Sequence, residues 1–100
     1  MARVFLSQAA LDDLLRLEQF LAESNDPLAG ELLDFVLDAL QVLTHQPGIG
    51  RPTAGGLREL IISRRRSGYL ARYEFKEIDD LVLVARIRHQ RECGYSAEEL

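Results

Sequence analysis

The segment YLARYEF at residues 69–75 carries the clearest structural pattern in this 100-residue chain. Its apolar residues stand at every second position, which places them together on one face of a β-strand. These residues are Tyr69, Ala71, Tyr73 and Phe75, and the opposite face carries Leu70, Arg72 and Glu74. The segment therefore predicts a strand with one face packed on a core and the other partly open to solvent.

Two further strands are expected on either side of this one in the sequence. Residues 57–63 are rich in β-branched and apolar side chains, and residues 81–87 are almost entirely apolar. The connections at residues 64–68 and 76–80 are short enough for hairpins, so the sheet is mainly antiparallel. In the last strand we expect one face to hold Leu83, Ala85 and Ile87, and the other to hold Val82, Val84 and Arg86.

The N-terminal half has the apolar periodicity of two helices. Residues 4–6 predict a short strand, and Ser7 is a suitable N-cap for a first helix that runs to about residue 23. Asp26 and Pro27 start a second helix, which the apolar spacing carries to about residue 45. The short break between the two helices predicts an antiparallel hairpin.

These elements predict one α+β domain. A short N-terminal strand and an antiparallel helical hairpin pack on a mainly antiparallel sheet of about four strands. The domain covers residues 1–91, and residues 92–100 form a C-terminal tail or a short helix. A chain of this length buries one modest core, which leaves little room for a deep catalytic cavity.

Charge is unevenly distributed along the chain. Residues 1–50 carry two basic and eight acidic side chains, whereas residues 51–91 carry ten basic and five acidic ones. The contrast favours an anionic partner for the second half, although two oppositely charged solvated faces would give the same numbers.

Several classes of protein do not fit the composition. No apolar run is long enough to span a bilayer, and the single Cys93 permits no internal disulfide, which fits a reducing cytoplasm. His45 and His89 lie in different regions without metal-ligand spacing, and no serine-hydrolase motif occurs. We therefore expect a cytoplasmic protein without a metal site or cofactor.

Arginines gather in two places. Arg64, Arg65 and Arg66 lie at the tip of a predicted hairpin, and Arg86, Arg88 and Arg91 surround His89. The planar guanidinium group suits the binding of phosphates and carboxylates. Metal-free RNA cleavage would also need an acid and a base, and no carboxylate near His89 matches it within the predicted strand.

A set of motifs occurs in a particular order along the chain. They are the Ala9/Ala10–Asp12/Asp13–Leu14 cluster, Pro47-x-x-Gly50-Arg51-Pro52, Leu57-Arg58-Glu59-Leu60, Tyr69-x-x-x-Tyr73 and Arg86-Ile87-Arg88-His89-x-Arg91. Together they resemble the RelE/ParE superfamily of type II toxin–antitoxin toxins, and are most similar to its ParE branch. The resemblance covers about residues 3–91 and implies the RelE-like fold.

The resemblance implies a bacterial toxin that an antitoxin holds inactive. ParE-type toxins inhibit or poison DNA gyrase by binding, so this interpretation assigns no catalytic residue and no enzymatic activity. Sister toxins of the RelE type are ribosome-dependent mRNA endonucleases, which is the alternative. A third hypothesis is a binding module without toxicity.

Two positions depart from the pattern of the nucleases. Leu70 stands where the superfamily often has an arginine that holds RNA phosphate, and Gln90 stands where some nucleases have a tyrosine after the histidine. Leucine binds no phosphate and glutamine does not titrate, so both departures favour the gyrase interpretation and leave His89 without an assigned chemical role.

Two surfaces are expected to bind partners. The gyrase-contacting residues predicted are Arg64, Arg65, Arg66, Arg88, His89 and Arg91. The antitoxin-contacting residues predicted are Arg72 and Arg86 on the open sheet face and Leu33, Leu37 and Leu40 on the second helix. The resemblance implies a ParD-like ribbon-helix-helix antitoxin in a heterotetramer or larger assembly, with no membrane contact and no sequence-specific DNA binding by this chain alone.

Overall fold

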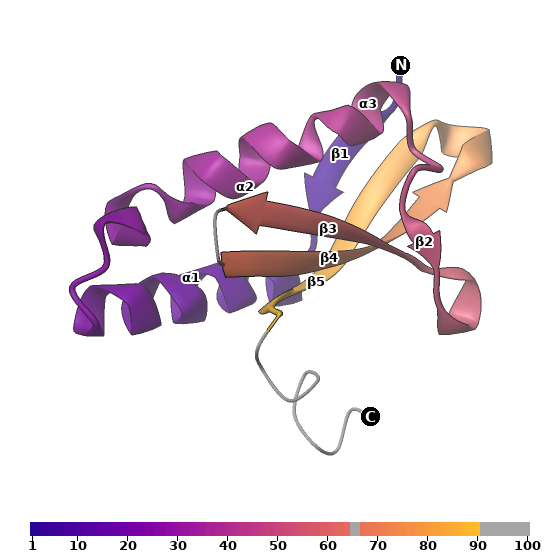
Figure 1. Cartoon of the computed structure of the whole chain (residues 1–100). Coiled ribbons are helices and arrows are strands. Elements are labelled where there is room, and N and C mark those ends of the chain that lie inside the picture. Colours follow the sequence, from indigo (N-terminus) through magenta and orange to yellow (C-terminus); the bar gives the residue numbers. More distant parts are fainter. Residues whose placement is uncertain (65–66, 91–100) are drawn as a thin grey trace.

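The computed structural model describes residues 1–64 and 67–90 and shows one twisted sheet with helices packed on it (Figure 1). The strands lie in the order β1-β5-β4-β3-β2. Their bounds are β1 Arg3–Leu6, β2 Arg51–Pro52, β3 Arg58–Arg64, β4 Ser67–Lys76 and β5 Leu81–His89. β1 pairs in parallel with β5, and the other neighbours are antiparallel. The α+β class and the mainly antiparallel sheet are confirmed.

The sheet has five strands rather than about four. The additional strand, β2, consists of two residues in the loop that precedes β3. Pro52 lacks a backbone donor, which restricts it to the edge of a sheet. Three-residue 3₁₀ turns lie on the connections, η2 at Ala54–Gly56 and η3 at Glu77–Asp79.

The first helix, α1, spans Gln8–Glu23 and begins as predicted. The Ser7 side chain accepts a hydrogen bond from the backbone N–H of Ala10 at 3.0 Å, which satisfies one of the orphan donors of the first turn. α1 buries the apolar stripe that the sequence indicates, and Asp13 lies within that stripe.

The second predicted helix is divided into three pieces. They are the 3₁₀ turn η1 (Pro27–Gly30), α2 (Leu32–Leu40) and α3 (Val42–His45). The Asp26 side chain accepts from the N–H of Leu28, so the predicted start is correct, but Gly30 follows within the first turn. Glycine carries a large entropic cost in a helix, which favours a break at this point.

β5 does not alternate as predicted, because its pairing with β4 shifts in register. Arg72 pairs with Arg86 and Tyr73 pairs with Val84, so Ala85 is left as an extra residue on β5. A bulge of this kind exchanges the faces of the residues that follow it. Val82, Val84 and Ile87 are therefore all buried, and the prediction that Ile87 shares its face with Leu83 and Ala85 is wrong.

The core lies between the helices and one face of the sheet. It combines the apolar stripes of α1 and α2 with the predicted inner face of β4, including the fully buried rings of Tyr69 and Tyr73. None of the helices in the described residues is both long and apolar enough to cross a bilayer. The predicted tail at residues 92–100 lies outside the described residues.

Candidate functional site

The sheet has a second face, turned away from the helices, which we call the open face. Cross-strand pairing places Leu70 between Ile61 and Arg88, and Arg72 between Glu59 and Arg86. Leu70 is buried but is not part of the core between helices and sheet, which agrees with its position on the open face. The open face thus brings Arg72, Arg86 and Arg88 together, as the sequence predicted for Arg72 and Arg86.

A buried carboxylate lies among these arginines. Glu59 on β3 is only 5% exposed, and its two oxygens lie 3.1 Å from Nη2 of Arg51 and 3.8 Å from Nη2 of Arg72. Burial of a carboxylate is costly unless opposite charges and hydrogen bonds compensate it. The two guanidinium groups provide that compensation, and in return their positions over the sheet are fixed.

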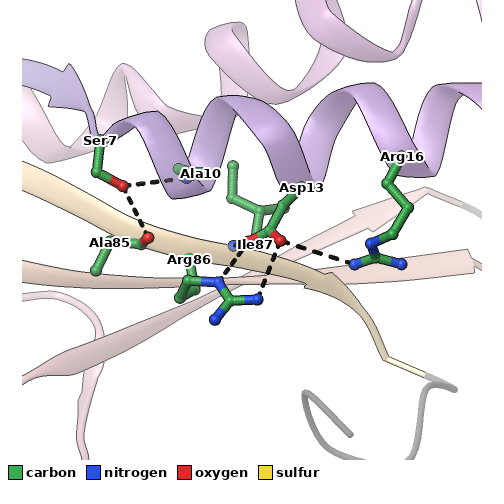
Figure 2. Close-up of polar contacts among 7 residues, drawn as sticks. All are labelled: Ser7, Ala10, Asp13, Arg16, Ala85, Arg86 and Ile87. Carbon is green, nitrogen blue, oxygen red and sulfur yellow. Dashed lines mark hydrogen bonds and ion pairs between the residues drawn. The ribbon is translucent and has the colours of Figure 1, made fainter.

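A second buried carboxylate comes from α1 and joins the helix to β5 (Figure 2). Asp13 Oδ2 accepts the backbone N–H of Ile87 at 2.8 Å and Nε of Arg86 at 2.9 Å, while Oδ1 accepts Nη2 of Arg86 at 3.2 Å. Arg16 contributes a longer ion pair at 3.9 Å. The two contacts to Arg86 form the bidentate geometry that is strongest for arginine and carboxylate.

The same helix satisfies one more backbone group of β5. β1 pairs only with the first half of β5, up to Val84. Just beyond it, the Ser7 hydroxyl donates to the carbonyl of Ala85 at 2.8 Å, and Asp13 binds the N–H of Ile87 (Figure 2). Side chains of α1 therefore replace a neighbouring strand along this edge of β5.

His89 lies on the opposite side of the sheet from the open face. Its ring contacts Tyr69 edge-on, with centroids 5.1 Å apart and planes at 89°. Because Tyr69 belongs to the core, this contact turns His89 away from the arginines of the open face. Gln90 caps the end of the strand, where its N–H donates to the carbonyl of Gly68 at 2.8 Å.

A third polar network holds the loop before β2 against the sheet. The hydroxyl of Tyr73 donates to the carbonyl of Pro47 at 2.7 Å and accepts the N–H of Gly50 at 2.9 Å. The carbonyl of Gly50 accepts Nη1 of Arg58 at 2.8 Å. Burial raises the pKa of the Tyr73 hydroxyl, and the hydrogen bond from Gly50 and the charge of Arg58 oppose this rise only in part. The network fixes the backbone at Gly50. It therefore also positions the next residue, Arg51, whose side chain reaches Glu59.

The other predicted contact residues have mixed outcomes. Leu33 is 44% exposed and Leu37 is half-buried, but Leu40 is 1% exposed and lies in the core. Leu40 packs in the core with almost no accessible surface, which argues against the predicted antitoxin contact at this residue. Arg64 ends β3, while Arg65, Arg66 and Arg91 lie outside the described residues.

Sequence reasoning missed Asp13 and Glu59 as organising residues. Asp13 carried a usable signal, because it lies three residues after Ala10 and four before Leu17, on the apolar stripe of α1. A charged residue on such a stripe indicates a buried partner. For Glu59 no such signal exists. It lies in β3, where the residue pattern does not show which face of the strand is buried.

Comparison with known proteins gives a consistent result. Residues 4–93 match the family model of the ParE toxin of type II toxin–antitoxin systems, parDE. The chain is 32% identical over 92 residues to a protein named toxin RelE3 from Caulobacter vibrioides, covering 92% of this chain and 98% of that one. A solved structure described as the chromosomal ParDE TA system from P. aeruginosa has the same fold, with a TM-score of 0.71 at 20% identity over 89% of this chain and 96% of that one.

Proposed function

The chain belongs to the ParE toxin family of type II toxin–antitoxin systems, and we propose that it arrests growth by binding and inhibiting DNA gyrase. In this proposal a cognate antitoxin neutralises it in the cytoplasm. The toxin acts as a binding protein, and none of its side chains performs a chemical step.

The observation that supports binding over RNA cleavage is the separation of His89 from the arginines of the open face. Cleavage of RNA without a metal needs a base and an acid within hydrogen-bond reach of the reacting phosphate. His89 packs against Tyr69 on the opposite side of the sheet, and Glu59 is buried between two arginines. Leu70 occupies the centre of the open face, where a phosphate would require a donor.

The antitoxin is proposed to cover apolar surface on the helical hairpin and to pass over the open face. Leu33 on α2 is 44% exposed, and Leu11 and Leu15 on α1 are 40% and 61% exposed. Amphipathic helices bind such surfaces through apolar anchors at helical spacing. Arg72 and Arg86 are half-exposed and complement an acidic segment. A ribbon-helix-helix antitoxin that dimerises would give a heterotetramer or a larger assembly.

Three assays on purified toxin distinguish the functions. Gyrase supercoiling and cleavage-complex assays are expected to respond in proportion to toxin concentration, and the antitoxin is expected to reverse the effect. A primer-extension assay on translating ribosomes is expected to show no cuts in codon register. Absence of any effect on gyrase at micromolar toxin contradicts the proposal.

The alternative, a ribosome-dependent mRNA endonuclease, is favoured by one observation. The relative with 32% identity over 92% of the chain carries the name RelE3. Codon-register cuts that appear with the toxin and disappear with the antitoxin would support this alternative, whatever the gyrase assay shows.

A further inference from the structure

β3 is longer than the strand that lies beside it at the edge of the sheet. β2 pairs only with Arg58 and Glu59, whereas β3 continues to Arg64 (Figure 1). From residue 60 onward, the part of the chain that the structure describes places no strand along the outer side of β3. Such an edge presents backbone donors and acceptors with which another strand can pair.

The backbone groups that point outward from this edge belong to Ile61 and Ser63. Just before β3, the carbonyl of Leu57 accepts the N–H of Thr53 at 2.8 Å, so Leu57 directs its backbone groups away from β4. Because this direction alternates along a strand in an antiparallel ladder, Glu59, Ile61 and Ser63 direct theirs to the same side. Glu59 uses its groups to pair with β2. Within residues 1–64 and 67–90, none of the backbone pairings engages the outward groups of Ile61 and Ser63.

The side chains along this edge do not prevent pairing. Natural sheets protect their exposed edges with charged side chains, prolines or bulges. Residues 60–63 read Leu-Ile-Ile-Ser, and the register between β3 and β4 is regular throughout. Ile61 is 49% exposed and Ser63 is also exposed, so both are accessible to a partner. The charged residues next in the strand are occupied within the chain, because Arg58 donates to a backbone carbonyl and Glu59 is buried in ion pairs.

We propose that this edge pairs with the same edge of a second copy of the chain, in a two-fold antiparallel arrangement. Ile61 of each copy opposes Ser63 of the other, and the two-fold axis passes beside Ile62. This register satisfies the outward N–H and C=O of both residues on both copies. A register that opposes Ile61 with itself would bring Ser63 against Glu59, whose backbone groups already pair with β2.

The edge itself favours a second copy over an unrelated strand. Its two outward residues are spaced two positions apart, so an antiparallel copy matches each donor with an acceptor. Residues 60–63 carry no charge that would attract an acidic or basic segment. Because both copies use the same edge, the assembly closes as a dimer. The contact is small, so we expect a dissociation constant of about 10–100 µM.

The dimer would join two sheets into one, with the open faces of both copies on the same side. Ile61 and the opposed Ser63 lie on that side of the sheet, because Ile61 pairs with Leu70. The proposal concerns only self-association, so it does not depend on which target the toxin binds.

Sedimentation equilibrium of the full-length protein tests the association. We expect the weight-average mass to rise from 11.3 kDa at about 1 µM toward twice that value at about 1 mM. Ile61→Lys is expected to keep the chain monomeric over this range, because a charge on an edge strand opposes pairing. Ile78→Lys is the matched control, since Ile78 is 100% exposed on η3 and gains the same charge. A mass that stays at the monomer, exceeds the dimer, or is unaffected by Ile61→Lys overturns the proposal.

Chemical crosslinking tests the register independently of the lysine variants. Cys93 is the only cysteine in the chain, so Cys93→Ser with either Ile61→Cys or Ser63→Cys gives one thiol per chain. Directly opposed Cβ atoms lie about 4.5–5.5 Å apart, and diagonal ones about 7–8 Å. A short thiol-specific crosslinker should therefore join an equal mixture of the two variants several-fold faster than either variant alone.

The same experiment distinguishes other uses of the edge. Crosslinking that is fastest within one variant alone contradicts the proposed register and overturns the proposal. An edge that is reserved for an extended segment of the antitoxin would leave the free toxin monomeric and uncrosslinked, which overturns it as well.

Discussion

The carboxylate of Asp13 on α1 accepts the backbone N–H of Ile87 on β5 at 2.8 Å, joining residues 74 positions apart in the sequence. The contact occurs directly beyond the last pairing of β1 with β5. It therefore replaces a sheet hydrogen bond with one from a helix side chain, and the same carboxylate holds Arg86 at the border of the open face.

Asp13→Ala is expected to lower the free energy of unfolding by about 1–3 kcal/mol, because the N–H of Ile87 loses its acceptor in a buried position. Asp12→Ala is the control, since Asp12 is exposed and its hydrogen bond to Gln8 is a surface contact. We expect that change to stay within about 0.5 kcal/mol. Urea denaturation measures both, and equal effects would contradict a structural role for Asp13.

The loop segment Gly48-Ile49-Gly50 offers two glycines with opposite surroundings. A Cβ at Gly50 would lie 2.6 Å from the hydroxyl oxygen of Tyr73 and 3.0 Å from the carbonyl of Glu59. Apart from its two chain neighbours, none of the described residues lies within 4 Å of a Cβ at Gly48. Gly50→Ala should destabilise the fold by about 1–3 kcal/mol. Gly48→Ala should leave stability unchanged or raise it by about 0.4–1 kcal/mol. Thermal unfolding measures the stability of both variants. If Gly48→Ala were less stable than Gly50→Ala, the packing described around Gly50 would be refuted.

Tyr73 predicts a loss of stability at alkaline pH. Burial raises its pKa in the folded state above the value of about 10 expected in the unfolded chain. The unfolded state therefore loses its proton first, and stability falls as the pH rises from about 10 through the folded pKa. Below pH 10 this contribution is constant. Urea denaturation from pH 8 to 11 should show a steeper decline for the native chain than for Tyr73→Phe.

The same substitution has a separate effect at neutral pH. Tyr73→Phe removes the hydroxyl that pairs with Pro47 and Gly50, while the ring is retained. We expect a loss of about 1–3 kcal/mol, since the N–H of Gly50 is left in a buried position. An unchanged free energy of unfolding would mean that water satisfies the carbonyl of Pro47 and the N–H of Gly50 after the hydroxyl is removed.

His89 distinguishes binding from catalysis. If the toxin acts on gyrase by binding, His89 is one of six predicted contacts, so His89→Gln should change gyrase inhibition and growth arrest by only about a few-fold. An acid or base in RNA cleavage contributes about 10²- to 10⁴-fold to the rate. A loss of toxicity of that size, at unchanged stability, would therefore favour the endonuclease. The unfolding midpoint of the variant serves as the control, because His89 contacts the ring of Tyr69.

Leu33 tests the hairpin as an antitoxin surface. Leu33→Lys places a charge on α2 where 44% of the leucine is exposed, and it should weaken antitoxin binding about tenfold or more. Ile78→Lys is the control, because Ile78 is 100% exposed on η3 at a turn of the sheet. Titration calorimetry measures both affinities. Charge reversal of Arg72 or Arg86 is less informative, since each is paired with a buried carboxylate and reversal would also destabilise the fold.

Local patterns in the sequence predicted the elements well. The alternation at residues 69–75 and the Ser7 cap correspond to β4 and the start of α1. The errors arise where tertiary contacts decide. The extra residue Ala85 in β5 follows from pairing with β4, and β2 exists only because β3 lies beside it. Leu40 has the same local pattern as Leu33, and only the packed structure shows which of them is accessible.

The parallel pairing of β1 with β5 also has a consequence for the order of events during synthesis. β1 leaves the ribosome before every other strand of the sheet, yet its partners are residues 81–84. The helices can form earlier, because their hydrogen bonds are local. The sheet closes only after four-fifths of this sequence has been made, and loop-closure entropy makes such distant pairings late and slow. A nascent chain that has not yet reached the end of β5 therefore lacks the finished open face.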